Sequence, residues 1–427
     1  MGSNAFTKEE KVLFAEQVVA AEDALDMAGL IAVKKMDTQD AQRSGDTVWI
    51  PRPQIQTSYD GLDQSANFAG KVQLSVPMRV NNMKSALFEL DALELRDKLA
   101  DKSLFQASME KLASDINLSI ISTINRWGSL FIPKTGVATG FADLADVATL
   151  LDQNGVKAAD RSIVLNPADY RDMADDLSKA SRSLIGDISV KALRQAFVGE
   201  LAGIQTYRQQ YTKNQAAAAG GAGLTMSTLF AGGNVWTPIS TLDSADGTQN
   251  VDSRRQQVAL SSNTGVSVGD RFTLADCFNI HPITKESTGS LKTYVVVDTV
   301  AGSATDVVIS PPFISALSPG EGGRQYQNVA DGSPAANTAL VFLNVDAAPQ
   351  NYFFHKDAIA LTPSLIAMPE DAGMAKMTAT LSNGIQLVAL KQGLIGPAKV
   401  QYRLTARWGV TVLAPEMVGS LAFNQVP

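Results

Sequence analysis

Apolar and polar positions recur with two different periods along this chain, and the first clear pattern is helical. Residues 7–30 carry apolar side chains at helical spacing, which predicts an amphipathic helix. Thr7 and Glu10 have the spacing of a capping box at its start, and Gly29 is expected to end it. The helix precedes any obvious core, so we expect it to pack on another part of the fold or on a neighbouring subunit. Its expected apolar face consists of Val12, Phe14, Ala15, Val18, Val19 and Leu25.

The strongest helical pattern covers residues 85–127, which no proline interrupts. Apolar residues recur there at spacings near three and four, while charged residues occupy the opposite face. We therefore expect one long helix, or a broken pair of helices, that forms a spine across a flat domain. The apolar positions are Leu87, Leu90, Leu95, Leu99, Leu112, Ile116, Ile120 and Ile124.

Between these two helical stretches, the pattern predicts an extended β-hairpin. Residues 43–51 read as a turn that leads into a short strand, and residues 71–76 alternate polar and apolar side chains. The polar, turn-rich residues 52–70 separate the two strands. Such an arm has few neighbours in its own chain, so a partner surface is expected to supply the missing contacts.

Residues 141–222 alternate helical and strand patterns. A helix is expected over 142–151 and a buried strand over 162–165. Asn166 is expected to cap a further helix with Pro167 at its first position. The Ala- and Gly-rich residues 215–223 have the composition of a flexible linker and mark the clearest domain boundary.

After this boundary, short strands separated by Gly, Asn, Asp and Ser turns predict an all-β module that runs to about residue 342. An α/β pattern then resumes, so the β module reads as an insertion. The expected strands of the module cover residues 258–260, 271–274, 293–297 and 306–309. Farther on, residues 399–413 predict a long strand with Tyr402, Leu404, Ala406 and Trp408 on one face.

Composition supports a globular protein of two or three domains, with 427 residues of which 45% are hydrophobic and 19% charged. The net charge of -7 is spread along the chain and forms no basic stripe, which disfavours a protein that reads nucleic acid. Cys277 is the only cysteine, and we expect a buried, unreactive thiol in a reducing cytosol. No apolar run reaches membrane-spanning length and the start lacks a signal-peptide pattern.

Candidate catalytic and metal motifs are weak. Residues 265–269 (GVSVG) match the elbow of serine hydrolases, but a turn and a strand follow Ser267 where a helix is required. His281 and His355 are the only histidines and, with one cysteine, cannot build a zinc site. Residues 246–252 lack the spacing and final glutamate of a calcium loop. We therefore expect no enzyme activity, cofactor or metal.

Four segments, taken in order, resemble the major capsid proteins of tailed phages. Residues 354–361 (FHKDAIAL) and 403–410 (RLTARWGV, followed by Pro415 and Glu416) are similar to segments late in that family. Residues 43–51 (RSGDTVWIP) and 166–170 (NPADY) resemble the coat proteins of short-tailed phages of the P-twenty-two group. The order and spacing of these segments fit that group across nearly the whole chain.

This resemblance implies an α+β fold of the Hong Kong 97 type, with an inserted all-β domain. It implies six parts: an N-terminal arm, an extended loop, a peripheral domain with the spine helix, the first part of an axial domain, an inserted β-barrel-like domain, and a return to the axial and peripheral domains. Their expected bounds are residues 1–45, 46–82, 83–131, 132–222, 223–344 and 345–427.

The implied function is a coat protein that builds an icosahedral shell of hexamers and pentamers in the host cytoplasm, as part of the virion. A scaffolding protein and a portal protein are implied partners, and the shell would enclose double-stranded DNA without sequence-specific binding. The rival interpretations are a β-rich tail fibre or adhesin, and a serine hydrolase that uses Ser267. The resemblance also implies that residues 242–255 reach a neighbouring capsomer, with Asp243, Asp246, Asp252, Arg254, Arg255 and Arg324 as contact residues.

Overall fold

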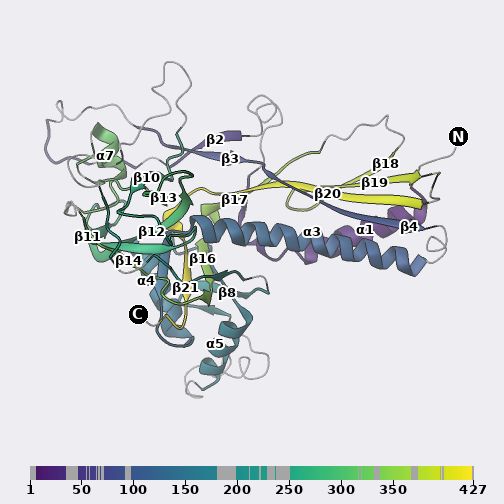
Figure 1. The fold of residues 1–427 in the computed structure, drawn as a ribbon, viewed down its shortest axis with the longest axis horizontal. Helices are drawn as coiled ribbons and strands as arrows, with labels where there is room; N and C mark the ends of the chain where they lie inside the picture. Colours follow the sequence, from purple (N-terminus) through teal and green to yellow (C-terminus); the bar gives the residue numbers. More distant parts are fainter. Residues whose placement is uncertain are drawn as a thin grey trace. The chain divides into compact units, whose positions relative to one another are not determined.

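The chain is described here from a computed structural model, and Figure 1 shows the helices and strands with their labels. The chain divides into two compact units. The first comprises Met1–Val48, Met78–Ile120 and Ile359–Thr411, and the second comprises Trp49–Pro77, Ile121–Ala358 and Val412–Pro427. The described residues are 6–34, 47–53, 55–56, 58–63, 65, 68, 72–91, 98–179, 199–210, 212–220, 223–227, 236, 251–315, 317–318, 320–330, 337–366, 374–394, 396 and 399–425. None of the helices among them is long and apolar enough to cross a membrane.

The first unit is built on a six-stranded sheet with the order β1-β17-β20-β19-β18, in which β4 also pairs with β20. The predicted face of β20 is confirmed, because Tyr402, Leu404, Ala406 and Trp408 are all buried. Trp408 donates its indole N–H to Ser119 Oγ at 2.7 Å, which ties this strand to α3. The bounds are β1 Ala32–Val33, β4 Asn82–Asp91, β17 Ile359–Pro363, β18 Ala375–Thr380, β19 Gln386–Leu394, β20 Lys399–Val412 and α3 Lys98–Trp127.

Helix α1, Lys8–Asp23, begins where predicted, with both hydrogen bonds of the Thr7 and Glu10 capping box present. It ends at Asp23, and a short 3₁₀ turn, Met27–Gly29, follows. The predicted apolar face of α1 is wrong in part, because the side chains of Val12 and Val19 are 60% and 59% exposed. Phe14 and Leu25 are buried as predicted, and the other buried side chains of this segment include Phe6, Glu10, Gln17 and Ala21.

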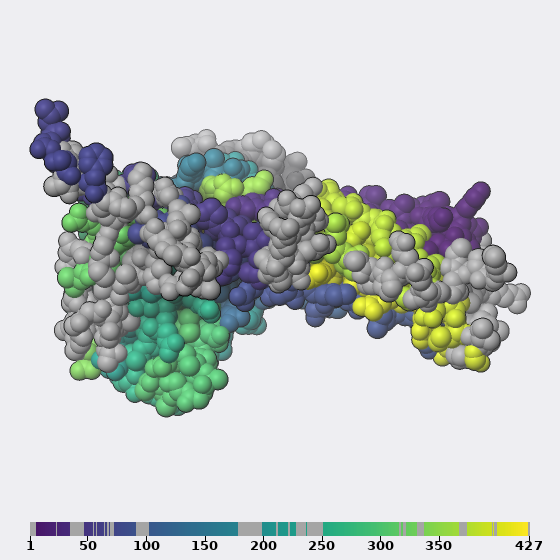
Figure 2. Space-filling view, turned by 90° about the horizontal axis from the view of Figure 1, so that it is seen from above, coloured from purple at the N-terminus to yellow at the C-terminus, as the bar shows by residue number. Residues whose placement is uncertain are grey.

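Glu10 explains why this face of α1 is buried, because its carboxylate accepts several hydrogen bonds, two of them from the sheet of the first unit. It accepts from Lys391 Nζ and from the Tyr402 hydroxyl, both at 2.7 Å, and from the Thr7 backbone N–H. A satisfied buried carboxylate is strongly directional, so it outweighs two exposed valines in setting the rotation of the helix. Figure 2 shows the helix in purple beside the yellow strands of this unit.

The helix predicted over residues 85–127 is wrong at its start. Residues 82–91 form strand β4, which pairs with β20 from Asn82↔Trp408 to Asp91↔Lys399. This pairing buries Leu90 and stacks Phe88 on Tyr402 with ring centroids 5.0 Å apart, while Leu87 stays 70% exposed. The tertiary partner therefore overrides a local pattern that a helix would also satisfy. Helix α3 begins at Lys98, and residues 92–97 lie outside the described residues.

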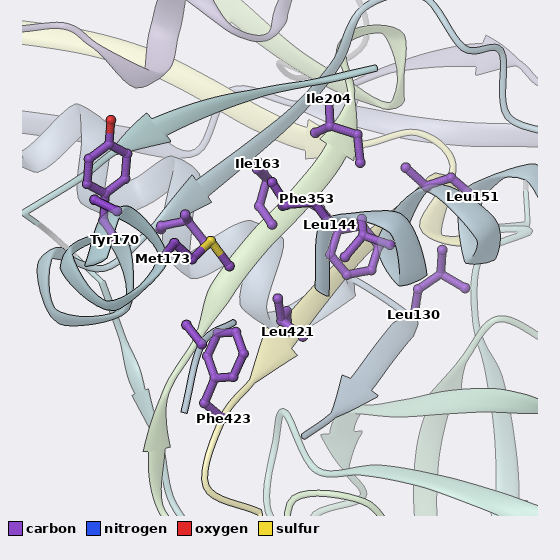
Figure 3. Packing of buried hydrophobic residues seen from close by; sticks show 14 of the residues in the cluster. Leu130, Leu144, Leu151, Ile163, Tyr170, Met173, Ile204, Phe353, Leu421 and Phe423 are labelled. Carbon is purple, nitrogen blue, oxygen red and sulfur yellow. The ribbon is translucent and has the colours of Figure 1, made fainter. Parts of the chain in front are cut away.

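The second unit contains an α/β core on a six-stranded sheet with the order β5-β21-β16-β6-β8-β7. The predicted helix, strand and Asn166-capped helix are confirmed as α4, β6 and α5, with Asn166 Oδ1 accepting from the Ala168 and Asp169 N–H groups. Figure 3 shows the apolar side chains that α4, α5 and the strands bury together. The bounds are β5 Leu130–Pro133, α4 Phe141–Gln153, β6 Arg161–Leu165, α5 Pro167–Lys179, β7 Glu200–Leu201, β8 Ile204–Arg208, β16 Asn351–His355 and β21 Val418–Ala422.

The strands of the predicted β module are observed as a five-stranded antiparallel sheet with the order β10-β13-β12-β11-β14. The module is not all-β, because it also contains the short helix α7. The chain leaves for this module after β9 and returns through β15, and these two strands pair with each other as an insertion requires. The module buries Cys277 completely, as expected. The bounds are β9 Asn214–Gln215, β10 Gln256–Ala259, β11 Arg271–Ile280, β12 Ser287–Thr299, β13 Asp306–Ser310, α7 Gly320–Tyr326, β14 Leu340–Phe342 and β15 Ala348–Pro349.

The predicted hairpin is present as β2, Thr47–Pro51, paired with β3, Ser75–Arg79. The second strand begins four residues later than residues 71–76 suggested. The backbone N–H of Arg52 donates to Leu74 O at 2.8 Å and continues the pairing beyond the strands. At the tip, Leu62 and Phe68 are 104% and 88% exposed.

Candidate functional site

The charged residues predicted to contact a neighbouring capsomer separate into three groups. Asp243 and Asp246 lie outside the described residues. Asp252 and Arg254 come together as a buried ion pair, with two hydrogen bonds of 2.8 Å between guanidinium and carboxylate. Arg255 is 53% exposed and lies 3.9 Å from Asp252 Oδ2, and Arg324 is exposed in the last turn of α7.

Arg254 is committed to contacts within its own unit. Its Nη1 donates to Val412 O at 2.7 Å, and its guanidinium carbon lies 4.0 Å from the centroid of the Trp127 ring. Its side chain is only 6% exposed, so this cation–π contact is largely shielded from water. Arg254 therefore joins the segment before β10 to the end of α3 and to the last residue of β20. A contact with another subunit stays a prediction for the whole set of charged residues.

Sequence reasoning missed a second buried cation, Arg271, the first residue of β11. Its guanidinium donates to Gly269 O at 3.0 Å and to Asn125 O at 3.2 Å, and its side chain is fully buried. It also lies 5.2 Å from the centroid of the Phe131 ring. Asn125 belongs to α3 and Phe131 to β5, so Arg271 attaches the inserted sheet to the α/β core of the second unit.

A group of hydrogen-bonded polar side chains lies around Arg271. The Asn125 amide donates to Gln215 Oε1 at 3.0 Å, and Gln215 is the last residue of β9, in the segment predicted to be a flexible linker. The Arg271 N–H donates to Asn344 Oδ1 at 3.0 Å, and the Asn344 amide donates to Asp270 Oδ1 at 2.9 Å. We call Asn125, Gln215, Asp270, Arg271 and Asn344 the junction cluster. It places side chains from both ends of the insertion around one buried cation.

Burial shifts the ionisation of the junction cluster. Loss of water lowers the pKa of Arg271 to about 10, although Tyr352 and Asp270 act in the opposite direction. Burial likewise raises the pKa of Asp270, and the hydrogen bonds from Ser267 and Asn344 reduce that rise. Both shifts follow from burial, since Asp270 is 1% exposed and Arg271 is 0% exposed. A sequence signal for it exists only in retrospect, as an Asp-Arg pair that opens a strand.

The described residues offer little support for catalysis. Ser267 lies in a tight turn, where its N–H donates to Asp270 Oδ2 at 2.8 Å, and strand β11 follows as the sequence analysis expected. His281 Nδ1 and His355 Nδ1 each accept backbone N–H groups of their own turns. Among the described residues, no group of three or more His, Cys, Asp or Glu side chains is placed to hold a metal ion.

Taken together, these contacts define a fold in which buried polar side chains fasten an inserted β module to an α/β core. A family model described as the P22 coat protein, gene protein 5, matches residues 1–423, and the chain belongs to this family. It is thus a major capsid protein, a component of the shell that such proteins build from their own copies. The expected mixed α+β capsid fold is confirmed, and the tail-fibre and hydrolase interpretations are not favoured.

Solved structures similar to this chain include phage capsid proteins. A structure from Mycobacterium phage Che8 is 12% identical, with a TM-score of 0.42, and the match covers 92% of this chain and 89% of that one. The mature capsid of bacteriophage PhiM1 is 9% identical, with a TM-score of 0.45 and coverage of 93% and 87%. The CUS-3 coat protein I-domain is 32% identical, with a TM-score of 0.22 and coverage of 29% of this chain and 96% of that one.

Proposed function

We propose that this coat protein assembles in the host cytoplasm into a closed icosahedral shell of hexamers and pentamers. A scaffolding protein guides a precursor shell, a portal protein joins it, and the shell expands when double-stranded DNA is packaged. Membership of the coat protein family supports this proposal. The dispersed net charge of -7 supports an enclosing role without sequence-specific DNA binding. Repeated weak contacts stabilise such a shell, because closure makes every further contact intramolecular.

The six parts expected from the sequence are proposed to share this work. The arm and the extended loop, residues 1–45 and 46–82, make contacts between copies. The peripheral and axial parts, residues 83–131, 132–222 and 345–427, form the floor of the shell. The inserted domain, residues 223–344, reaches across to a neighbouring capsomer. Exposed Arg255 and Arg324, with Asp243 and Asp246, are the proposed charged contacts there, each contributing about 0–1 kcal/mol.

The observation that carries the self-assembly proposal is the hairpin tip. Leu62 and Phe68 are 104% and 88% exposed, although each would gain about 1.5–3 kcal/mol from full burial. Figure 2 shows the described residues around position 60, in dark violet, projecting from their unit. Exposed large apolar side chains on a projecting hairpin are typical of a surface that is buried in an assembly. A second copy of the chain is the partner that a shell supplies.

The test compares two double variants of the tip. Leu62→Ser with Phe68→Ser removes the apolar surface, whereas Leu62→Met with Phe68→Tyr keeps it. Each protein is expressed with a phage scaffolding protein, particles are counted by negative-stain microscopy, and folding is checked by circular dichroism. We expect folded serine variants with few shells, and normal shells from the conservative pair. Normal shells from the serine variant would show that the tip is not buried between copies.

The charged contacts need a separate test. Charge reversal in Arg255→Glu or Arg324→Glu should reduce the yield of shells, and urea titration of each monomer separates this effect from a loss of stability. Arg208→Glu, at an exposed arginine of β8, is the matched control. Equal yields from all three variants would remove Arg255 and Arg324 from the proposed interface.

A further inference from the structure

Helix α7 of the inserted module holds one residue at the base of the hairpin arm by both of its backbone groups. The Val72 N–H donates to Gln325 Oε1, and the Tyr326 hydroxyl donates to Val72 O, each at 3.1 Å. Val72 lies three residues before the start of β3, in the segment that returns from the exposed tip. Two hydrogen bonds to the same peptide segment fix its orientation as well as its position.

Apolar packing reinforces this attachment. Leu74 is 1% exposed and packs in one cluster with Ile314 and Tyr326 of the inserted module. One residue farther on, Ser75 O accepts from the Ser253 N–H at 3.2 Å and from Ser253 Oγ at 2.8 Å. Val72 and Ser75 therefore bind the inserted module through their backbone groups, and Leu74 between them binds it through its apolar side chain.

Helix α7 is itself short, and Lys285 supports its C-terminal end. The Lys285 ammonium donates to Gln325 O at 2.7 Å and to Gln327 O at 3.2 Å. A cation at this end satisfies carbonyl groups that lack helical partners and interacts favourably with the helix dipole. Lys285 lies between β11 and β12 and has φ +58, a left-handed conformation that is unfavourable for lysine. In this strained conformation the Lys285 amine reaches the carbonyl groups at the end of α7.

We propose that Lys285 is a positioning residue, which fixes α7 and thereby lets the inserted β module set the direction of the hairpin arm. The chain of contacts runs from the turn between β11 and β12, through the α7 carbonyl groups, to Val72 and Leu74. The consequence for assembly rests on the proposed function, because it requires that the arm packs on a neighbouring copy. The positioning itself is a property of the monomer and can be measured there.

The experiment follows amide hydrogen exchange in the full-length soluble monomer. Lys285→Met keeps the length of the side chain but removes its donors, and Tyr326→Phe removes only the hydroxyl that binds Val72 O. Tyr207→Phe is the control, since the Tyr207 hydroxyl donates to Gln205 at the surface of the same unit. We expect exchange of residues 72–76 to rise about two- to tenfold in both test variants, the factor expected for one lost hydrogen bond. The control should leave it unchanged.

The outcomes separate the inference from the proposed function. If α7 exchanges faster in Lys285→Met while residues 72–76 keep their protection, the relay through α7 is overturned. If Lys285→Met does not fold, unchanged exchange in Tyr326→Phe overturns the attachment of the arm. If both variants loosen residues 72–76 but still assemble normal shells, the positioning holds and the proposed role of the arm in assembly fails.

Discussion

Arg271 offers the sharpest test of how the inserted module is held. The substitution Arg271→Met keeps an unbranched apolar stem and removes the guanidinium. It leaves Gly269 O and Asn125 O without the donor that they now share. A buried acceptor that loses its partner costs about 1–3 kcal/mol, so two such acceptors cost roughly 2–6 kcal/mol.

A smaller effect opposes this loss. Arg271 is fully buried and its Nε has no hydrogen-bond partner among the described residues, so its removal relieves some desolvation cost. The centre of the range for the two acceptors is about 4 kcal/mol. Allowing about 1–2 kcal/mol for that relief, we expect Arg271→Met to destabilise the junction by roughly 2–3 kcal/mol. Arg255→Met, at a half-exposed arginine nearby in sequence, should change stability by less than about 0.5 kcal/mol.

Native-state hydrogen exchange measures this effect without assuming that the whole chain unfolds in one step. The free energy of opening should fall for amides of β11 and for the end of α3 near Asn125, and remain unchanged in the sheet of the first unit. A loss below about 1 kcal/mol in β11 would refute the reasoning, since the carbonyl groups would then have found other partners. Equal losses in Arg271→Met and Arg255→Met would refute it as well.

Three further predictions follow from the buried side chains. Burial alone raises the pKa of Glu10, but hydrogen bonds from Lys391, Thr7 and Tyr402 outweigh this effect and lower the pKa. The stabilisation of α1 by Glu10 should therefore be present above pH about 4.5 and lost as the pH falls below that value. Glu10→Gln should abolish this pH dependence in an acid titration that follows hydrogen exchange of α1. Burial raises the pKa of Cys277 to about 12. A thiol reagent should therefore label Cys277 very slowly in the native protein and at once in the urea-unfolded protein. Rapid labelling of the native protein would contradict the burial of this thiol. Phe105→Ala should destabilise the first unit by about 3–5 kcal/mol in urea titrations. Leu104→Ala, at a neighbour that is 37% exposed, should cost clearly less.

Local signals identified many elements of this protein correctly. The capping box of α1, the Asn166 cap of α5 and the alternating face of β20 depend on residues close together in sequence, and each is confirmed. The switch from α/β to all-β patterning also indicated the inserted module, and motif order indicated the family. These features share a physical cause, since caps, turns and periodic faces are decided within a few residues.

The errors and omissions have the opposite cause. Residues 82–91 carry leucines that fit a helix, but pairing with β20 makes them a strand. The face that α1 buries is set by Glu10, whose hydrogen-bond partners Lys391 and Tyr402 lie far away in sequence. Nothing in the sequence distinguishes buried Arg254 and Arg271 from exposed Arg255. The sequence alone thus determined most of the elements and the family. The tertiary structure decided the strand at residues 82–91 and which polar groups are buried, because both depend on partners brought together only by folding.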